Sequence, residues 1–442
     1  MRPLNTHPLF PVIECLRGAV VAIVVLLLVQ TFLVEGLLTP HVVSSCSMSP
    51  ALRGPHVALR CPECQTAFCI ETGHLPQTSP DDLPLSWATC PACAFAQVPV
   101  FRDSFHKGDR IFIHRAIPSL RPIRRWETIL FRTPDDGKLT VKRVVGLPGE
   151  TLEIRDGDIY VDGKITAKPF AVQNEMRIPV PYGRWEMQMA EESGLYELAY
   201  YPIRNVPHTK PLFEMNDDSN ESNIHSEELP RHVLYGVTNQ LCENQWRGQD
   251  ADNIFPVDDL MLTFDWRPEN TMPLSLRLAD VATEKPIELD FNPGDYTLRV
   301  SIDVNTFQSD LPRLATDNPH RIVVSLFDRQ LTVAVDDSII FEQPLDVKIA
   351  IPFALCLPGN KMLSQLEQET AIKRQIENLR VWRDVYYTQK PDGFPNASSF
   401  FSVTIPKDCY FLLGDNSCFS VDSRSWQNTF VTQCDMIGLI SL

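Results

Sequence analysis

An apolar run near the N-terminus restricts what this chain can fold into. Residues 18–34 are almost entirely apolar and are interrupted only by a Gln-Thr pair. Extended to residue 38, the run reaches about 20 residues, the length of one helical bilayer crossing. Arg17 at its start favours a cytoplasmic N-terminus. We therefore predict one transmembrane helix over residues 18–38, with residues 1–17 in the cytoplasm.

A cleavable secretory signal peptide is the alternative interpretation of this run. Its apolar core would usually be only ~7–15 residues long and would precede a small-x-small cleavage site. Thr39-Pro40-His41 does not provide such a site. We therefore expect an uncleaved, single-pass anchor in the cell membrane, which makes the lipid bilayer a partner and places the rest of the chain outside the cytoplasm.

The length and charge of the chain restrict its architecture and partners. Its 442 residues suit two or three domains rather than one. The net charge is −16, which argues against a nucleic-acid partner because phosphate binding needs a basic surface. The 36 prolines and 19 glycines suit loops and strand edges better than long helices. A mainly β fold is expected.

Four of the 12 cysteines form two Cys-Pro-x-Cys pairs. The pairs are Cys61 with Cys64 and Cys90 with Cys93. Paired thiolates of this spacing can share one tetrahedral Zn²⁺, and four cysteine ligands leave no open position for catalysis. We predict a structural zinc in a zinc-ribbon-like insert over residues 59–100. Two small disulfide loops are the alternative, and Cys69 could serve as a substitute ligand.

The middle of the chain reads as a series of short strands. Residues 154–164 predict a hairpin with Asp-Gly turns. Between residues 167 and 395 many short alternating runs predict a β-sandwich, which weakly resembles laminin-G and concanavalin-like sandwiches. Such sandwiches often bind a protein or a glycan, although a spacer or docking role is the alternative. Trp266 and Trp382 are expected in its core rather than on a ligand platform.

Ser47 is the candidate nucleophile, because it follows closely after the apolar run. A serine hydroxyl needs a base to take its proton. None of the 10 histidines lies in a convincing motif. Lys142 lies in an apolar, strand-like run, where burial would favour the neutral amine and lower its pKa. Lys142 is therefore the better candidate for the base of Ser47, and the alternative is a solvated lysine, which is usual for a lysine beside an arginine in a strand.

Three sequence blocks resemble the type I signal peptidase, or leader peptidase, family. They are Ser47-Met48-Ser49-Pro50, Lys142-Arg143-Val144-Val145-Gly146-Leu147-Pro148-Gly149-Glu150, and Gly414-Asp415-Asn416 followed by Ser420-Val421-Asp422-Ser423-Arg424. The blocks stand in the family's order and cover roughly residues 17–54, 104–166 and 397–440. The resemblance implies a serine peptidase without a catalytic cofactor. Its substrates would be secretory preproteins, cleaved after small-x-small residues while the extended signal peptide lies against a strand edge.

The resemblance also implies a role for each matching residue. Ser47 would be the nucleophile and Lys142 the general base, and the Ser45 hydroxyl would join the Ser47 N–H in the oxyanion hole. The supporting residues would be Ser420, which orients the lysine, the ion pair Asp422 and Arg424, the buried carboxylate Asp415, and Met48 beneath the site.

The sequence departs from the family pattern in three places. Cys46 stands where many members have glycine, Ala51 replaces a common threonine, and Trp126-Glu127 replaces Gly-Asp. Because Cys46 could crowd the oxyanion hole, a membrane-anchored binding or docking protein with an inactive peptidase core is the alternative function. A self-cleaving repressor-type serine–lysine peptidase is a second alternative, but that class normally lacks an anchor.

These features predict a peptidase domain divided by two inserts. Its three parts would be residues 39–58 with the nucleophile, 101–166 with the base, and 396–442. The zinc-ribbon-like insert, 59–100, separates the first two parts, and the sandwich, 167–395, separates the last two.

Overall fold

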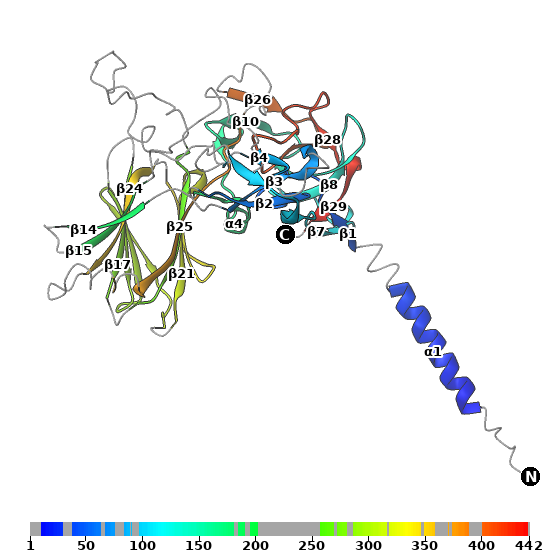
Figure 1. Ribbon diagram of the computed structural model, residues 1–442, viewed down its shortest axis with the longest axis horizontal. Coiled ribbons are helices and arrows are strands. Elements are labelled where there is room, and N and C mark those ends of the chain that lie inside the picture. Colours follow the sequence, from blue (N-terminus) through cyan, green and yellow to red (C-terminus); the bar gives the residue numbers. More distant parts are fainter. Residues whose placement is uncertain are drawn as a thin grey trace, which may run out of the picture.

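The computed structural model is mainly β, as predicted. It describes residues 10–29, 38–62, 67–75, 84–88, 90, 97–180, 184–190, 195–201, 257–268, 272–280, 286–315, 318–345, 349–358, 370, 374–388 and 400–440. The sheets fall into a peptidase module, a cysteine-rich unit and a two-sheet sandwich, which we describe in turn (Figure 1).

An antiparallel seven-stranded sheet forms the centre of the peptidase module, in the order β1-β7-β29-β8-β9-β27-β28. Its strands are β1 (Leu38–Val42), β7 (Arg110–His114), β8 (Thr128–Arg132), β9 (Leu139–Gly146), β27 (Cys409–Leu413), β28 (Val431–Thr432) and β29 (Met436–Ile440). The short helices α3 (Ile117–Leu120) and η6 (Gln433–Asp435) connect its strands. The sheet thus unites three parts of the chain that lie far apart in the sequence.

A four-stranded sheet, in the order β12-β11-β10-β26, completes this module. Its strands are β10 (Thr151–Arg155), β11 (Asp158–Val161), β12 (Lys164–Ile165) and β26 (Phe400–Thr404). Strands β10 and β11 form the predicted hairpin, with Asp156 and Gly157 at φ 49° and 91° in its turn. Leu152 pairs with Val403 across the long insert, and a core that includes Leu152, Val145 and Phe411 joins the two sheets.

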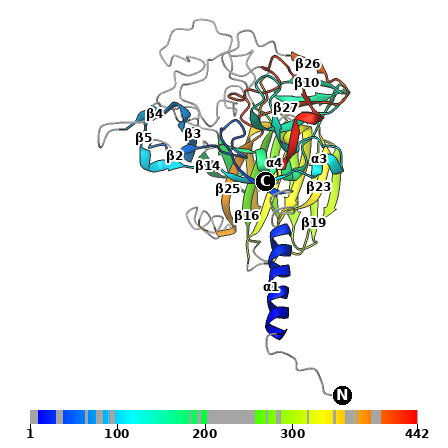
Figure 2. The ribbon, with the colours of Figure 1, turned by 90° about the vertical axis from the view of Figure 1, so that its right-hand side faces the viewer.

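The cysteine-rich unit consists of a three-stranded and a two-stranded sheet, which project to one side of the molecule (Figure 2). Its elements are β2 (His56–Arg60), β3 (Ala67–Glu71), η2 (Thr72–His74), β4 (Ser86–Ala88), β5 (Val98–Val100), η3 (Arg102–Ser104) and β6 (Phe105–His106). Cys61 and Cys90 are both buried in the small core between these strands.

Two antiparallel sheets form the sandwich and enclose one large apolar core. The six-stranded sheet contains β13 (Ile178–Pro179), β16 (Leu260–Trp266), β21 (His320–Ser325), β22 (Gln330–Val335), β23 (Ser338–Pro344) and β25 (Ile376–Arg383). The seven-stranded sheet contains β14 (Arg184–Ala190), β15 (Leu195–Tyr201), β17 (Leu274–Asp280), β18 (Pro286–Asn292), β19 (Thr297–Ile302), β20 (Asn305–Asp310) and β24 (Ile349–Pro358). The turn η5 (Phe327–Arg329) joins β21 to β22.

The two tryptophans expected in the sandwich core, Trp266 and Trp382, lie in different environments. Trp266 is buried in the core between the sheets, where its ring centroid lies 6.1 Å from that of Phe291. Trp382 is partly buried on the outer face of the six-stranded sheet, and its Nε1 donates to Thr263 Oγ1 at 2.8 Å. Helix α4 (Phe170–Met176) contributes Phe170 to a small apolar cluster on this face, and Trp382 packs against the same cluster.

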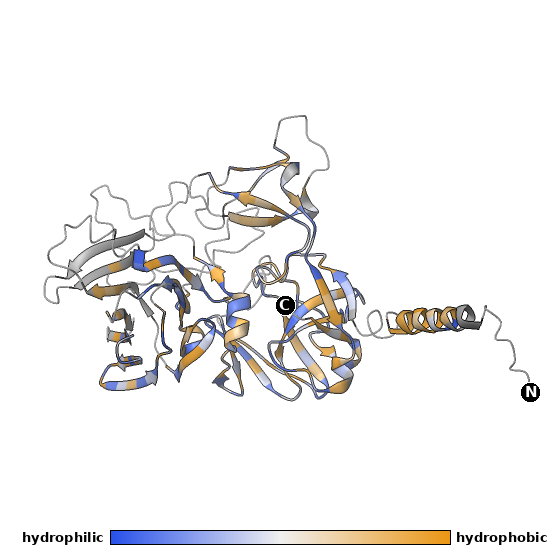
Figure 3. Ribbon diagram, turned by 90° about the horizontal axis from the view of Figure 1, so that it is seen from below, coloured by the Kyte–Doolittle hydropathy of each residue, from blue (hydrophilic) through white to orange (hydrophobic). Residues whose placement is uncertain are grey.

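The N-terminal helix α1 (Phe10–Leu28) lies apart from the sheets and is mostly apolar (Figures 1 and 3). It begins eight residues before the predicted transmembrane segment. That segment's predicted end, residue 38, is instead the first residue of β1. Within the part of the chain that the structure describes, no helix meets the length and hydropathy expected of a membrane span.

Candidate active site

Ser47 lies in a tight turn after β1, and its side chain is partly exposed. The turn is closed by backbone hydrogen bonds from Ser49 N–H to Cys46 O at 3.1 Å and from Leu52 N–H to Met48 O at 2.9 Å. Ser45 Oγ is 3.3 Å from Ser47 Oγ. The predicted nucleophile and oxyanion-hole hydroxyl therefore face the same side of the turn.

Lys142 reaches Ser47 from β9 across 95 residues of sequence. Its Nζ donates to Ser47 Oγ at 2.7 Å and to Ser420 Oγ at 2.8 Å. The lysine is only 1% exposed. Burial lowers its pKa from an ordinary 10.5 to about 8, because the neutral amine loses less solvation than the ammonium form. The predicted base is thus close to its hydroxyl and partly neutral near neutral pH.

Gly414 allows the two serine-bearing segments to approach each other. A Cβ at this position would overlap Ser420 Oγ and lie 2.5 Å from Ser47 O. Asn416 stabilises the approach of these two segments. Its backbone N–H donates to Ser47 O at 3.1 Å, and its Nδ2 donates to Cys46 O at 3.3 Å. The Gly-Asp-Asn block therefore holds the Ser47 turn against the loop that carries Ser420.

Asp422 and Arg424 form the predicted ion pair, and both side chains are buried. Arg424 Nε and Nη2 donate to the two Asp422 carboxylate oxygens at 2.8 and 2.7 Å. The Gly414 N–H donates to Asp422 Oδ2 at 3.0 Å. Burial alone would raise the pKa of Asp422, but Arg424 and then Lys142 hold it below its usual range. A carboxylate therefore stays ionised near the Lys142 amine.

Asp415 is a buried carboxylate, and it forms an ion pair with Arg143. It accepts hydrogen bonds from Arg143 Nε at 2.9 Å and from Nη2 at 2.8 Å, and both side chains are buried. Despite burial, Asp415 raises the pKa of Arg143 above its usual range. Arg143 directly follows Lys142 in the second sequence block, but nothing in the block indicates Asp415 as its partner.

Cys46 and Met48 both point into the protein. Cys46 is 0% exposed, in contrast to the partly exposed Ser45 and Ser47 on either side. Met48 is 1% exposed and belongs to a core with Ile111 and other apolar residues, consistent with its predicted place beneath the site. The Cys46 side chain is therefore buried on the opposite side of the turn from the two serine hydroxyls.

The Trp126-Glu127 departure also has a structural consequence. Trp126 has φ of 70°, a left-handed conformation that favours glycine and costs a bulky residue free energy. Its side chain is buried and contributes to the core between the two peptidase sheets. Its carbonyl accepts from Arg143 Nη1 at 2.8 Å. The backbone here has the conformation that glycine would adopt, and the tryptophan ring adds core packing.

The predicted zinc ligands are only partly described. Cys61 and Cys90, one from each pair, are 0% and 1% exposed and share one apolar core. Cys64 and Cys93 lie outside the described residues. Among described side chains, the one group close enough to share a cation consists of Asp158, Asp259 and Asp328, far from the cysteines in the sequence. The described residues thus bring together two of the four predicted ligands.

Comparison with known proteins identifies a family for this arrangement. A family model described as "Signal peptidase, peptidase S26" matches residues 94–223 and 354–442. These ranges contain Lys142, Ser420, Asp422 and Arg424 but not Ser47. Signal peptidase I V of Bacillus subtilis (strain 168) is 39% identical over 15% of this chain and 39% of its own length. Signal peptidase I S of the same strain is 27% identical over 29% of this chain and 64% of its own length.

Solved structures also show weak similarity. Domains LG4-5 of the mouse laminin alpha1 chain are 12% identical, cover 34% of this chain and 41% of their own, and have a TM-score of 0.19. A carbohydrate binding module, CBM66 from Bacillus subtilis, is 8% identical, covers 22% of this chain and 66% of its own, and has the same TM-score, 0.19. TM-scores of 0.19 are too low to indicate that the sandwich shares a fold with these structures.

The two ranges of the family match contain the second and the third sequence block, in the same order as in the chain. The chain spans 37–39% of the length of three curated signal peptidases that it matches. The second range of the family model, residues 354–442, includes the segment after the long insert, where the Gly-Asp-Asn and Ser-x-Asp-Ser-Arg blocks lie. The chain belongs to the signal peptidase, peptidase S26, family.

Proposed function

We propose that this protein is a membrane-bound serine endopeptidase that removes N-terminal signal peptides from exported preproteins. Ser47 would be the nucleophile and Lys142 the general base. The observation that carries the proposal is the 2.7 Å contact between Lys142 Nζ and Ser47 Oγ, made by a buried lysine whose pKa is lowered to about 8. A buried amine with this pKa is neutral often enough to accept a proton.

The proposed reaction has two stages. The neutral Lys142 amine accepts the proton of Ser47 Oγ as this oxygen attacks the scissile carbonyl carbon. The Ser45 hydroxyl and the Ser47 N–H donate to the oxyanion that forms. Lys142 then gives its proton to the leaving amine, and an acyl-enzyme remains on Ser47. In the second stage Lys142 takes a proton from a water molecule that attacks the ester carbonyl carbon. The bond to Ser47 Oγ then breaks, the lysine returns the proton to this oxygen, and the acyl product leaves as a carboxylic acid.

An open strand edge supports the proposed mode of substrate binding. β9 pairs with β8 over Leu139–Arg143, whereas its described pairing with β27 covers only Arg143–Gly146. Among the described residues, no strand pairs with β9 before Arg143 on the β27 side. We propose that an extended signal peptide adds to this edge by backbone hydrogen bonds, which places its scissile bond beside Lys142 and Ser47. Shallow apolar pockets there would select small residues at the cleavage site.

We also propose that α1 anchors the enzyme at the membrane with its N-terminus in the cytoplasm. Its apolar side chains are exposed around the helix, including Val21, which is 61% exposed, and Leu26, which is 65% exposed. A helix with apolar residues on every side would be unstable in water but suits a lipid environment. Because β1 begins at Leu38, the Ser47 turn would lie close to the membrane surface.

A structural zinc in the cysteine-rich unit stays part of the proposal. Cys61 and Cys90 in one small core suit a closed cysteine site, which would link the two small sheets. Metal analysis of the purified protein should find one zinc per chain. Absence of zinc together with oxidised Cys61, Cys64, Cys90 and Cys93 would show disulfide loops instead.

The dyad is tested with a signal-peptide-bearing reporter in membranes that contain no other signal peptidase. The parent chain should release the mature reporter, and Ser47→Ala and Lys142→Ala should abolish release. Two matched controls, Ser402→Ala and Lys138→Ala, change exposed residues of the same module and should process normally. Processing by either dyad variant would reject the assignment. A parent chain that binds the reporter without cleaving it would favour a docking protein.

A further inference from the structure

The chain that returns from the sandwich runs directly to the candidate active site. Residues 384–388 follow β25 and leave the six-stranded sheet. The Asp384 N–H donates to Asp259 O at 3.0 Å, which ties the start of this segment to the sandwich. The Tyr387 N–H donates to Gly157 O at 3.1 Å, which ties its middle to the peptidase hairpin. We call residues 384–388 the return segment.

The last residue of the return segment, Thr388, contacts the residues that support the dyad. Arg424 Nη1 donates to Thr388 O at 2.6 Å and to Thr388 Oγ1 at 3.2 Å. The Thr388 N–H donates to Ser417 Oγ at 3.0 Å, and the same oxygen accepts from Arg424 Nη1 at 3.0 Å. All three side chains are buried. One side of the Arg424 guanidinium is thus held by Asp422 and the other by Thr388 and Ser417.

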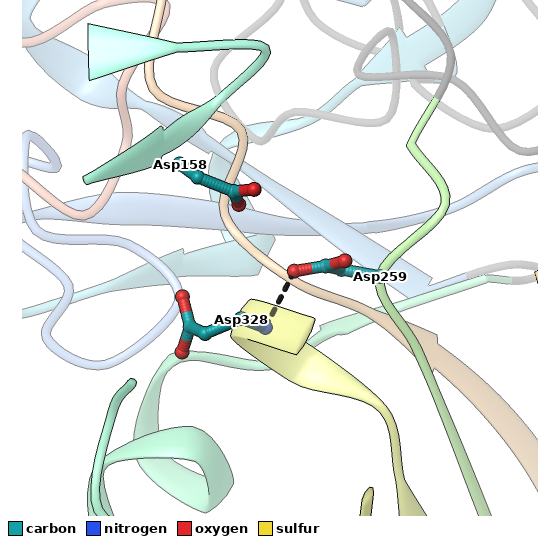
Figure 4. A group of neighbouring side chains, drawn as sticks. All are labelled: Asp158, Asp259 and Asp328. Atoms are coloured by element: carbon teal, nitrogen blue, oxygen red, sulfur yellow. Dashed lines mark hydrogen bonds between the residues drawn. The ribbon is translucent and has the colours of Figure 1, made fainter. Parts of the chain in front are cut away.

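The start of the return segment is fixed by a buried charge cluster. Lys168 Nζ donates to Asp384 Oδ2 and to Asp328 Oδ1, both at 2.6 Å. Asp158 from β11 and Asp259 before β16 converge on the same place, and Asp259 accepts from the Asp328 N–H at 2.7 Å (Figure 4). Because the cluster contains groups from both modules, it limits how far the return segment can shift relative to the peptidase sheets.

We propose that Thr388 is a positioning residue for the Ser47–Lys142 pair. By holding the Arg424 guanidinium against Asp422, it sets how much uncompensated negative charge the Lys142 amine faces. The inference rests on the proposed peptidase function and adds to it a contact supplied by the insert. The sandwich is then joined to the active site by a contact that acts on the base.

The direction of the effect follows from the charges around Lys142. Asp422 and Asp415 favour its ammonium form, and Arg424 favours the neutral amine. Arg143, the next residue on β9, is paired with Asp415. Loosening Arg424 from Asp422 removes positive charge near Lys142 and leaves Asp422 less compensated. Both changes raise the pKa of Lys142, so a smaller fraction of the enzyme carries a neutral base at a given pH.

The test compares three variants of the full chain in detergent. Thr388→Val removes the acceptor Oγ1 but keeps the side-chain volume and the backbone carbonyl. Thr388→Ser keeps the hydroxyl. Thr404→Val changes a threonine on β26 whose hydroxyl is exposed and remote from the dyad. The pH profile of kcat/KM is measured on a signal-peptide substrate. The pKa of Lys142 is measured separately by NMR of ¹³C-labelled lysine, assigned by the signal that Lys142→Ala removes.

Thr388→Val should move the acid limb of the profile to higher pH by about half a unit or more, and the NMR pKa by the same amount. Thr388→Ser and Thr404→Val should leave both at the parent values. A Thr388→Val profile that is lower but unshifted, with an unchanged NMR pKa, would overturn the positioning role. If the parent chain cleaves nothing, the proposed function fails, whereas the NMR comparison still decides the effect of Thr388 on Lys142.

Discussion

The environment of Lys142 determines when it can act as a base. Burial is the largest influence on its pKa and lowers it to about 8, and Arg424 acts in the same direction. Asp422 and Asp415 oppose this shift, and their charges limit how far the pKa falls. A lysine in water would be almost fully protonated at neutral pH. The fold therefore supplies the base mainly by excluding water.

The pH dependence of activity follows from this pKa. kcat/KM should rise with pH and level off above an apparent pKa of about 8, because the neutral amine is the active form. The measurement is kcat/KM from pH 5 to pH 10 on a peptide substrate whose own groups do not titrate in this range. A profile that is already level at pH 6 would show that the group controlling the reaction is not a lysine of this pKa.

Substitution of Gly414 tests whether the close approach of the Ser47 turn and the Ser420 loop is needed for activity. Gly414→Ala places a Cβ against Ser420 Oγ and Ser47 O, so the turn and the loop must separate. A displacement near 1 Å can lower the rate ~100-fold, and we expect at least this loss in kcat. Gly73→Ala is the matched control, because a Cβ there meets nothing within 4 Å. Equal activity of the two variants would contradict the close approach seen at Gly414.

Several site residues could be predicted from the sequence, and others could not. Ser47, Lys142 and Ser420 lie in blocks whose order resembles a known family, and the structure places the Lys142 amine within hydrogen-bonding distance of both serine hydroxyls. The Arg143–Asp415 pair joins residues 272 positions apart, and neither residue type reveals its partner. Thr388 lies outside every block, since its role depends on where the sandwich returns the chain.

Buried side chains of opposite charge lie at the junction between the peptidase module and the sandwich. Asp328 and Asp384 both form ion pairs with the Lys168 ammonium group, and Asp158 lies beside Asp328. Burial and the neighbouring carboxylates raise the pKa of Asp158 to about 7 and that of Asp384 to about 6. The junction therefore takes up protons in the folded protein at a pH where the unfolded chain has released them.

The sign of the resulting stability change is fixed by these pKa values. Between pH 4 and about pH 7 the folded state binds more protons at Asp158 than the unfolded state does, so the free energy of unfolding falls as pH rises. Asp158→Asn should raise stability at pH 8 by on the order of 1 kcal/mol and flatten this dependence. Denaturant unfolding at pH 5 and pH 8 measures both effects. Asp156→Asn, in the same turn but exposed, should change neither.

Elements whose structure depends on local chemistry, such as the β10–β11 hairpin, could be predicted from the sequence. The Asp-Gly dipeptide of the β10–β11 hairpin adopts positive φ at both positions, which is the backbone conformation that these residues tolerate. α1 begins at Phe10, eight residues before the predicted segment, because apolar content does not show where a helix begins, and its first turns include Pro11 and Glu14. Strand partners such as β9 and β27 depend on long-range packing, which no local pattern encodes.

In the whole molecule, two long inserts interrupt the sequence of one peptidase module, and the chain returns to this module after each insert. The strands before and after the sandwich pair with each other, as Val144 and Leu412 show. The cysteine-rich unit is likewise inserted between β1 and β7, which are adjacent strands of the same sheet. Both inserts thus leave the strand pairing of the module intact, while the return segment links the larger insert to the dyad.

α1 and the sheets have separate proposed roles: α1 binds the membrane, and the sheets hold the dyad. A chain that lacks residues 1–29 loses a helix that pairs with no strand of the described residues, so its dyad should form and it should cleave a short peptide within about threefold of the parent rate. It should no longer sediment with lipid vesicles, because the exposed apolar surface of α1 is removed. The substitution Val21→Ala, which keeps the helix, is the control and should still sediment. Vesicle binding by the truncated chain at the parent level would place the membrane contact on the sheets instead of on α1.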